Sequence, residues 1–265
     1  MSGDFIGKGD FMITVGIDIG SITTKAALIR DGELAAVSLA FTGYNSEAAG
    51  RAVFEKLLAE ASLDTERVDR IISTGYGRNS VTFADKALTE ITCHAAGAHF
   101  IDPSVRSIID IGGQDSKSIV VDDKGKVKDF AMNDKCAAGT GRFLEVMARA
   151  LELDLEEFGR MSLDAEKPSR ISSLCTVFAE SEVISLISKG ESRENIIAGI
   201  HESIASRITA MARRTGVVSP VMMTGGVAKN AGIVKAIEDK LGTNLIISPQ
   251  SQMTGAIGAA FLAMG

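Results

Sequence analysis

Two short segments of the sequence combine an aspartate, glycine, hydroxyl groups and a lysine in the order expected of a phosphate-binding turn. The first, from Asp18 to Lys25, reads DIGSITTK and directly follows an apolar run. Gly20 allows backbone N–H groups to approach an anion without obstruction, and Lys25 supplies positive charge. Phosphate repels a carboxylate, so we expect Asp18 to be a catalytic outer ligand of Mg²⁺ that binds through water. Further phosphate donors are expected at Ser21, Thr23 and Thr24.

The second segment, from Asp110 to Lys117, reads DIGGQDSK and repeats this pattern. Gln114 is predicted to orient an attacking water, and Asp115 to hold that water or the metal. Asp110 is expected to reach Mg²⁺ through water, as Asp18 does. Two such turns around one metal–nucleotide would supply the positioning and charge stabilisation that phosphoryl transfer requires. The expected phosphate-binding residues of this segment are Gly112, Gly113 and Ser116.

A third glycine-containing segment, MTGGVAKN at 223–230, is expected to face the nucleoside. A strand should end at Gly225-Gly226 and a helix should start near Ala228, with Asn230 in its first turn, so that a helix N-terminus meets the ligand. Lys189 and Gln250 are further candidates for the adenine side. The chain has neither GxxxxGK[ST] nor a strand–GxGxxG–helix unit, which excludes P-loop and Rossmann sites. Each segment alone is explained by a tight turn, but the ordered set favours a nucleotide site.

The elements that position these segments form an internal repeat. ITVGIDIG at 13–20 and SIIDIGG at 107–113 each begin a predicted β-hairpin that is followed by another strand. The same unit occurring twice, about ninety residues apart, indicates a duplication and an α/β fold. Helices are predicted over 46–61, 86–99, 139–151, 177–189, 192–215, 229–241 and 252–263, and strands over 68–74, 221–225 and 244–248.

Composition and charge limit the class of protein. A chain of 265 residues can form two modest lobes. Its net charge of −6 argues against nucleic acid or an anionic membrane as a partner. No apolar run approaches the roughly 20 residues needed to cross a bilayer, and no secretory signal is recognisable, so a cytoplasmic location is expected. Residues 1–11 are expected to be a disordered lead-in.

Two of the three cysteines, Cys136 and Cys175, each precede a predicted amphipathic helix. A helix N-terminus favours a thiolate or an anionic metal–sulfur cluster. A cubane cluster takes four thiolates, so two cysteines permit such a site only if a two-fold homodimer supplies the other pair. The alternative is that both are ordinary buried apolar residues. We assign Cys93, His94 and His99 to ordinary packing of the helix 86–99.

The ordered set of three glycine-containing segments resembles the actin, sugar kinase and Hsp70 ATPase superfamily over residues 13–263. That resemblance implies two duplicated ribonuclease H-like lobes, an actin-like ATPase fold, with ATP in the interlobe cleft. It assigns 12–100 to lobe I and 101–251, with the cysteines, to lobe II. The C-terminal helix 252–265 is expected to pack back on lobe I.

A narrower resemblance rests on DIGGQDSK, NDKCAAGTGRFLE, CTVFAESEV and MTGGVAKN. Together they are similar to the activator (component A, archerase) of 2-hydroxyacyl-CoA dehydratases, to which ATPase subunits of benzoyl-CoA reductases are related. The resemblance implies a homodimer that binds ATP or ADP with Mg²⁺ and holds one [4Fe-4S] cluster on Cys136 and Cys175 of both subunits. A ferredoxin or flavodoxin would reduce it, and ATP hydrolysis would drive a low-potential electron into the dehydratase, where radical chemistry follows.

Two other functions are compatible with the nucleotide motifs. A small-molecule kinase of the same superfamily would use an aspartate such as Asp115 as general base. A non-catalytic ATP-binding scaffold would need no metal–sulfur site. Neither function requires the cysteine pair, which therefore distinguishes them from the activator.

Overall fold

The computed structural model describes residues 11–172 and 175–265, which divide into two compact units. Unit 1 extends to Thr89 and resumes over Gly255–Gly265, and unit 2 comprises Glu90–Thr254. The lead-in predicted to be disordered, 1–11, lies outside the described residues except for Phe11. Within the described part of the chain, no helix is both long and apolar enough to span a bilayer.

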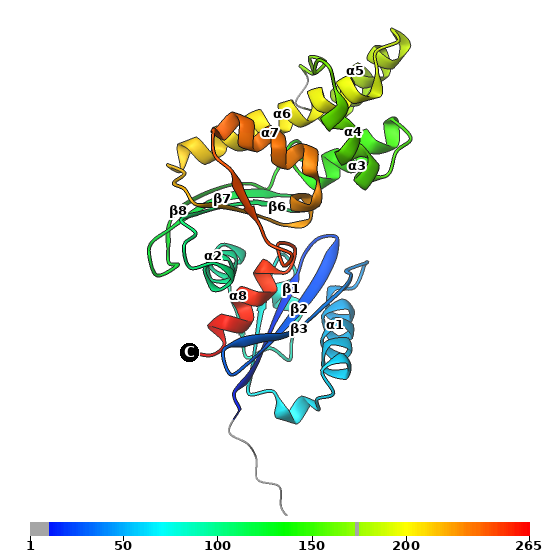
Figure 1. Ribbon diagram of the computed structural model, residues 1–265. Helices are drawn as coiled ribbons and strands as arrows, with labels where there is room; N and C mark the ends of the chain where they lie inside the picture. The colour runs from blue at the N-terminus through cyan, green and yellow to red at the C-terminus, as the bar shows by residue number, and fades with distance from the viewer. Residues whose placement is uncertain (1–10, 173–174) are drawn as a thin grey trace, which may run out of the picture. The chain divides into compact units, whose positions relative to one another are not determined.

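Unit 1 is built on a five-stranded sheet in the order β3-β2-β1-β4-β5. The first three strands form an antiparallel meander, and β4 and β5 extend it in parallel from β1. The strands are β1 Ile13–Ile19, β2 Thr23–Arg30, β3 Glu33–Phe41, β4 Arg70–Thr74 and β5 Lys86–Ala87. Helices α1 (Ser46–Glu60) and α8 (Thr254–Leu262) lie on opposite sides of this sheet (Figure 1).

Alternation along β1 explains why two helices can cover the two faces of the sheet. Ile19 faces α1, where its Cδ1 lies against Gly50. Gly16 and Thr14 face α8, and the Thr14 hydroxyl donates a 2.8 Å hydrogen bond to the carbonyl of Ala260. A Cβ at Gly16 would collide with the α8 backbone, so only glycine permits this close packing.

Unit 2 repeats this sheet, with the order β8-β7-β6-β9-β10 and the same mixture of antiparallel and parallel pairs. The strands are β6 Ser107–Ile111, β7 Ser116–Val121, β8 Val127–Asn133, β9 Val221–Thr224 and β10 Leu245–Ile247. Helix α2 covers one face and helices α6 and α7 cover the other (Figure 1). The helices of this unit are α2 Glu90–Ile101, α3 Gly141–Ala150, α4 Leu155–Met161, α5 Thr176–Ser188, α6 Arg193–Arg214 and α7 Ala231–Leu241.

The predicted duplication is confirmed by the identical strand order in the two units. Helix α8 follows β10 of unit 2 and packs in unit 1, while α2 follows β5 of unit 1 and packs in unit 2. The two units therefore exchange one helix each, on the equivalent face of each sheet.

One boundary expected from the sequence is wrong. The helix predicted over 86–99 begins instead at Glu90, after the short strand β5, and the unit boundary lies between Thr89 and Glu90 rather than after residue 100. The physical reason is burial, because Ala95 and Ala98 of α2 pack in one cluster with Ile108 of β6. Helix α4 was not predicted, whereas the other predicted helices and strands match observed elements to within two residues.

Candidate functional site

The two predicted phosphate-binding turns have the same backbone register. Asp18 pairs with Lys25 across β1 and β2, and Asp110 pairs with Lys117 across β6 and β7. The Nζ–carboxylate distances are 3.4 Å and 3.1 Å, and both aspartates are buried. We call these pairs of strands the first hairpin (residues 13–30) and the second hairpin (residues 107–121). The repeat seen in the sequence is thus also a repeat of buried ion pairs.

The glycine of each hairpin turn uses its own N–H group to close that turn. Gly20 N donates to Thr23 O at 3.1 Å, and Gly112 N donates to Asp115 O at 3.0 Å. In the described part of the chain, no partner is found for the N–H groups of Gly113 and Gln114, which follow Gly112. These two groups, rather than that of Gly112, are available to an anion.

The predicted hydroxyl donors differ in exposure. Thr24 is fully buried and its Oγ1 lies 2.9 Å from that of Thr42, which in turn donates to Gly20 O at 2.8 Å. Thr24 therefore supports the first turn from behind, and Ser116 of the second hairpin is buried as well. The two hydroxyl residues that remain partly exposed at the first turn are Ser21 and Thr23.

The lysine of the second hairpin lies inside a cluster of carboxylates. Lys117 is 2% exposed, and its Nζ lies 2.7 Å from Asp115, 2.9 Å from Glu90 and 3.1 Å from Asp110. Lys25 of the first hairpin is more open and has one such partner among the described residues, Asp18. Lys117 is thus committed to protein carboxylates, while Lys25 remains suited to a phosphate.

Two further side chains from other elements hold Asp110. The Thr224 hydroxyl donates to Asp110 Oδ1 at 2.8 Å, and His94 Nδ1 lies 3.4 Å from the same oxygen. His94 is a buried residue of α2, as its interpretation as an ordinary helix residue requires, and its contact with Asp110 was not predicted. Glu90 was missed altogether, although its i,i+4 spacing from His94 places both on one face of α2.

These contacts shift the protonation of the buried pair. Burial alone raises the pKa of the Asp110 carboxyl, but His94, Lys117 and the Thr224 hydroxyl outweigh it and hold that pKa well below its usual range. Burial likewise lowers the pKa of the Lys117 ammonium, but the carboxylates of Asp110, Glu90 and Asp115 outweigh it and raise that pKa. Both groups are therefore charged at neutral pH.

A Thr-Gly pair closes the carboxyl end of each sheet beside the aspartate. Gly225 follows β9 with φ +86°, and a Cβ there would lie 3.0 Å from Asp110 Oδ1. Gly75 follows β4 with φ +91°, and a Cβ there would collide with Ile19 and Asp18. Thr74-Gly75 therefore repeats Thr224-Gly225. Gly75 was not predicted to belong to the site, although the Thr-Gly dipeptide after a strand is shared with Thr224-Gly225.

The segment expected to face the nucleoside has a different local structure from the predicted one. Residues 226–229 form a 3₁₀ turn, and Asn230 is the N-cap of α7, accepting a 3.0 Å hydrogen bond from Ile233 N, rather than a residue of the first turn of a helix from Ala228. Gly225 N donates to Ser251 O at 2.9 Å.

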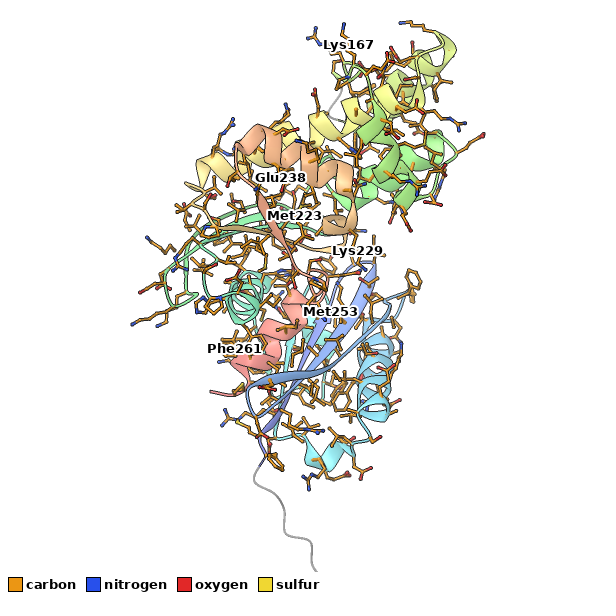
Figure 2. The ribbon with its side chains drawn as sticks, viewed as in Figure 1. Lys167, Met223, Lys229, Glu238, Met253 and Phe261 are labelled. Carbon is orange, nitrogen blue, oxygen red and sulfur yellow. The ribbon has the colours of Figure 1, made fainter. Side chains whose placement is uncertain are left out.

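Two other candidates for the adenine side lie in different places. Gln250 lies in the turn that contains Ser251. Lys229, which is labelled in Figure 2, donates a 2.7 Å hydrogen bond to the nearby Gln252. Lys189, by contrast, is an exposed residue at the C-terminal end of α5.

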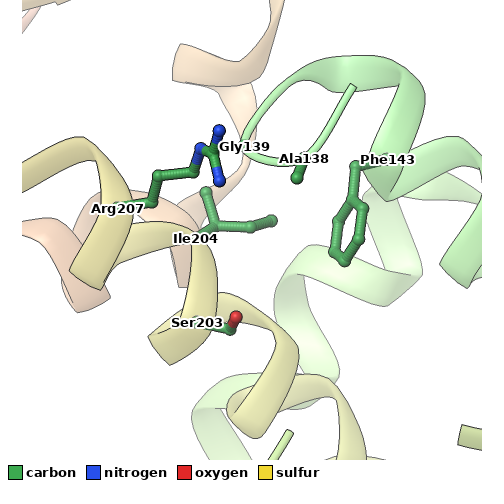
Figure 3. A pocket seen from close by; sticks show the side chains of 6 residues that line it. All are labelled: Ala138, Gly139, Phe143, Ser203, Ile204 and Arg207. Carbon is green, nitrogen blue, oxygen red and sulfur yellow. The ribbon is translucent and has the colours of Figure 1, made fainter. Parts of the chain in front are cut away.

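Cys136 lies in the loop between β8 and α3, half-buried. Asn133 fixes this loop by donating to the carbonyls of Cys136 at 2.8 Å and Ala138 at 3.2 Å. Figure 3 shows Arg207 of α6 beside Gly139 at the end of the loop, where the absence of a side chain leaves room for the arginine stem. The loop is thus held against α6.

Two backbone hydrogen bonds join the second hairpin to the helix that follows the Cys136 loop. Gly141 N donates to Gly112 O and Arg142 N donates to Gly113 O, both at 2.8 Å. Gly141 and Arg142 are the first two residues of α3, and the Cys136 loop directly precedes them. A shift of the phosphate-binding turn would therefore be transmitted to α3 and to this loop.

Cys175 is exposed and is the N-cap of α5, a helix with a bare apolar surface. α5 buries Ala179 and Val183 in the core. Its exposed apolar residues are Val177, Phe178, Ile184 and Ile187. Cys93, in contrast, is buried inside α2.

The cysteines fit half of a four-thiolate site. Over the described residues, one chain contains no cluster of three or more histidine, cysteine, aspartate or glutamate side chains that could hold a metal ion. Neither Cys136 nor Cys175 is in a disulfide, and the side chain of Cys175 makes no capping hydrogen bond to the start of α5. Backbone N–H groups at that helix end favour an anionic group beside Cys175.

The duplicated sheet with its paired hairpins has the fold that actin-like ATPases and sugar kinases share. The model of the BadF/BadG/BcrA/BcrD ATPase family matches residues 15–263, and the chain belongs to this family. It is 51% identical over 253 residues to the activator of lactoyl-CoA dehydratase of Anaerotignum propionicum, covering 95% of this chain and 97% of that one.

Two solved structures share the whole fold. Component A of the (R)-2-hydroxyglutaryl-CoA dehydratase of Acidaminococcus fermentans has a TM-score of 0.92 at 48% identity, covering 95% of this chain and 97% of that chain. The activator of the 2-hydroxyisocaproyl-CoA dehydratase of Clostridium difficile, with bound ADPNP, has a TM-score of 0.89 at 45% identity, covering 95% and 94%.

Proposed function

We propose that this chain is an ATPase that activates a 2-hydroxyacyl-CoA dehydratase by ATP-driven transfer of a low-potential electron. Support comes from the names of its relatives, which are dehydratase activators at 45–51% identity over nearly the full chain. It also comes from the two hairpins, each of which pairs a lysine with a buried aspartate, and from two cysteines of the same chain that form no disulfide. A ferredoxin or flavodoxin is the proposed electron donor.

The proposed nucleotide site uses the turns of both hairpins. Asp18 would hold Mg²⁺ through water, and Lys25 would neutralise phosphate charge. The free N–H groups of Gly113 and Gln114 would bind phosphate, and the Gln114 side chain would orient the attacking water. Asp110 already accepts hydrogen bonds from Lys117 and Thr224 and lies 3.4 Å from His94 Nδ1. Its main proposed role is therefore to anchor the second hairpin, with a water-mediated contact to Mg²⁺ as a second role.

The proposed cluster site is shared by two copies of the chain. Cys136 and Cys175 of each copy would together hold one [4Fe-4S] cluster, which when bound supplies one-electron transfer at low potential. The bare apolar face of α5 begins beside Cys175, so a second copy seated there would bury Val177 and Phe178 and complete the thiolate set. The N-terminal N–H groups of α5 would stabilise the negative charge.

The observation that carries the proposal is the pair of hydrogen bonds from Gly141 and Arg142 to Gly112 and Gly113. Binding and hydrolysis of ATP act on the turn at Gly112, and these bonds pass any displacement to α3 and the Cys136 loop. A kinase needs no such connection. The aspartate considered as its general base, Asp115, is already engaged with Lys117 at 2.7 Å.

The first test is the iron and sulfide content and the oligomeric state of protein purified without oxygen. We expect about four irons per dimer, lost in Cys136→Ser and in Cys175→Ser. Cys93→Ala, inside α2, is the matched control and should keep its iron. Wild-type protein that contains no iron but still hydrolyses ATP would exclude the proposed cluster and favour the kinase function.

A further inference from the structure

Glu90 is the first residue of unit 2, directly after the chain leaves unit 1. Two residues earlier, Leu88 is bonded to β4 in unit 1, with its N–H donating to Ser73 O at 2.8 Å and its carbonyl accepting from Thr74 Oγ1 at 3.1 Å. Glu90 is the first residue of α2 and pairs with Lys117 of unit 2 at 2.9 Å. The crossing segment is therefore fastened to the end of a strand on one side and to the second hairpin on the other.

The partners of Lys117 divide into a buried and an accessible side. Asp110 is almost fully enclosed, whereas the side chains of Asp115 and Glu90 are 26% and 21% exposed. The Lys117 ammonium thus lies closest to Asp115 and Glu90, the two carboxylates that are partly exposed. Three carboxylates against one ammonium leave the cluster with two excess negative charges, so the position of Lys117 depends on the balance among all three.

The first hairpin offers an internal comparison. Its lysine, Lys25, pairs with Asp18 at 3.4 Å, and no glutamate corresponds to Glu90 among its described ion-pair partners. The additional carboxylate is therefore a property of the hairpin that also carries Gln114 and the backbone bonds to α3.

We propose that Glu90 is a positioning residue for the second hairpin. Its carboxylate holds Lys117 between Asp110 and Asp115, and so fixes the orientation of the Asp115 carboxylate and of the neighbouring Gln114. This inference rests on the proposed ATPase function. It assigns Glu90 no contact with ATP, so its loss should affect turnover more than nucleotide binding.

Glu90→Gln tests this inference, with Glu47→Gln as the matched control. Glu47 is also an acidic residue in the first turn of a helix, α1, but it is exposed and accepts a 3.3 Å hydrogen bond from the Thr82 hydroxyl instead of pairing with a hairpin lysine. We expect Glu90→Gln to lower kcat for ATP hydrolysis about tenfold or more with KM within about twofold, because small misplacements of catalytic groups are costly. Glu90→Asp, which keeps the charge, should recover part of the loss, and Glu47→Gln should match the wild type.

The outcomes separate the inference from the function on which it rests. Wild-type protein without ATP hydrolysis overturns both. Normal wild-type hydrolysis with an unchanged kcat in Glu90→Gln overturns the positioning role alone. An equal loss of kcat in Glu90→Gln and Glu90→Asp would also contradict it, because it would show dependence on side-chain shape rather than on charge. Binding of ADPNP, measured for each variant, confirms that the nucleotide site is still formed.

Discussion

Replacement of Lys117 by methionine should destabilise unit 2 strongly and in a pH-dependent way. Methionine preserves most of the volume but leaves Asp110 buried without its ammonium, with Asp115 and Glu90 beside it. Removing one partner of a buried ion pair costs about 3–5 kcal/mol of unfolding free energy. For a unit of this size that corresponds to a fall of about 10 °C in Tm.

The sign of the pH dependence follows from the Asp110 pKa. In the wild type that pKa is depressed, so its stabilisation is present above the unfolded pKa near 3.9 and is lost only as pH falls through the lower folded value. Without Lys117 the pKa of Asp110 rises from its depressed wild-type value, because only His94 and the Thr224 hydroxyl then oppose burial. Asp110 of the variant therefore takes up its proton at a higher pH than in the wild type, and the stability deficit of the variant should shrink as pH falls.

The first hairpin supplies the control for this experiment. Lys25→Met removes the equivalent lysine, which is more exposed and has a single longer ion pair, so about 1–2 kcal/mol is expected. Calorimetry at pH 8 and pH 5 measures both variants. Equal losses for Lys117→Met and Lys25→Met, or a Lys117→Met loss independent of pH, would refute the assignment of the buried cluster.

Three further substitutions test other parts of the structure. Gly16→Ala should detach α8 from β1, because the new Cβ would collide with the α8 backbone. Limited proteolysis should then cleave off the C-terminal segment. A C-terminal segment that stays intact would contradict this packing. Gly141→Ala places a methyl group 3.1 Å from Gly112 O. It should leave the rate of ATP hydrolysis within about threefold of the wild type while lowering dehydratase activation by about tenfold or more. Parallel changes in the two rates would argue against coupling through α3. His201 is buried, and burial lowers its pKa to about 3. Wild-type stability should therefore fall as pH drops below 6.5, and His201→Leu should remove up to about 3 kcal/mol of that loss at pH 4. Acid unfolding measures both proteins, and identical profiles would exclude this role.

The sequence predicted the duplication because each hairpin is a local unit. Asp18 and Lys25 lie seven residues apart, as Asp110 and Lys117 do, so an apolar run, a turn and a second run are enough to place them opposite each other. The bounds of most helices could also be predicted from local sequence, because the capping residues and the apolar periodicity lie within each segment.

The parts that were not predicted depend on contacts between distant segments. Glu90 and His94 reach the second hairpin only because α2 packs on the sheet of unit 2, which its near-uniform small apolar composition does not reveal. The hydroxyl partner of the buried Thr24 is Thr42, which follows the end of β3. The hydrogen bonds from Gly141 to Gly112 and from Arg142 to Gly113 likewise join segments whose pairing no local pattern encodes.

The central claim, that ATP hydrolysis drives an electron from this chain into a dehydratase, is tested most directly by activation itself. Anaerobically reduced protein would be mixed with purified lactoyl-CoA, 2-hydroxyisocaproyl-CoA and (R)-2-hydroxyglutaryl-CoA dehydratases, the partners named for its relatives. We expect at least one to become active with MgATP and reductant, and none with ADPNP or without reductant. Activation that needs no ATP, or iron-containing protein that hydrolyses ATP and activates none of the three, would contradict the account.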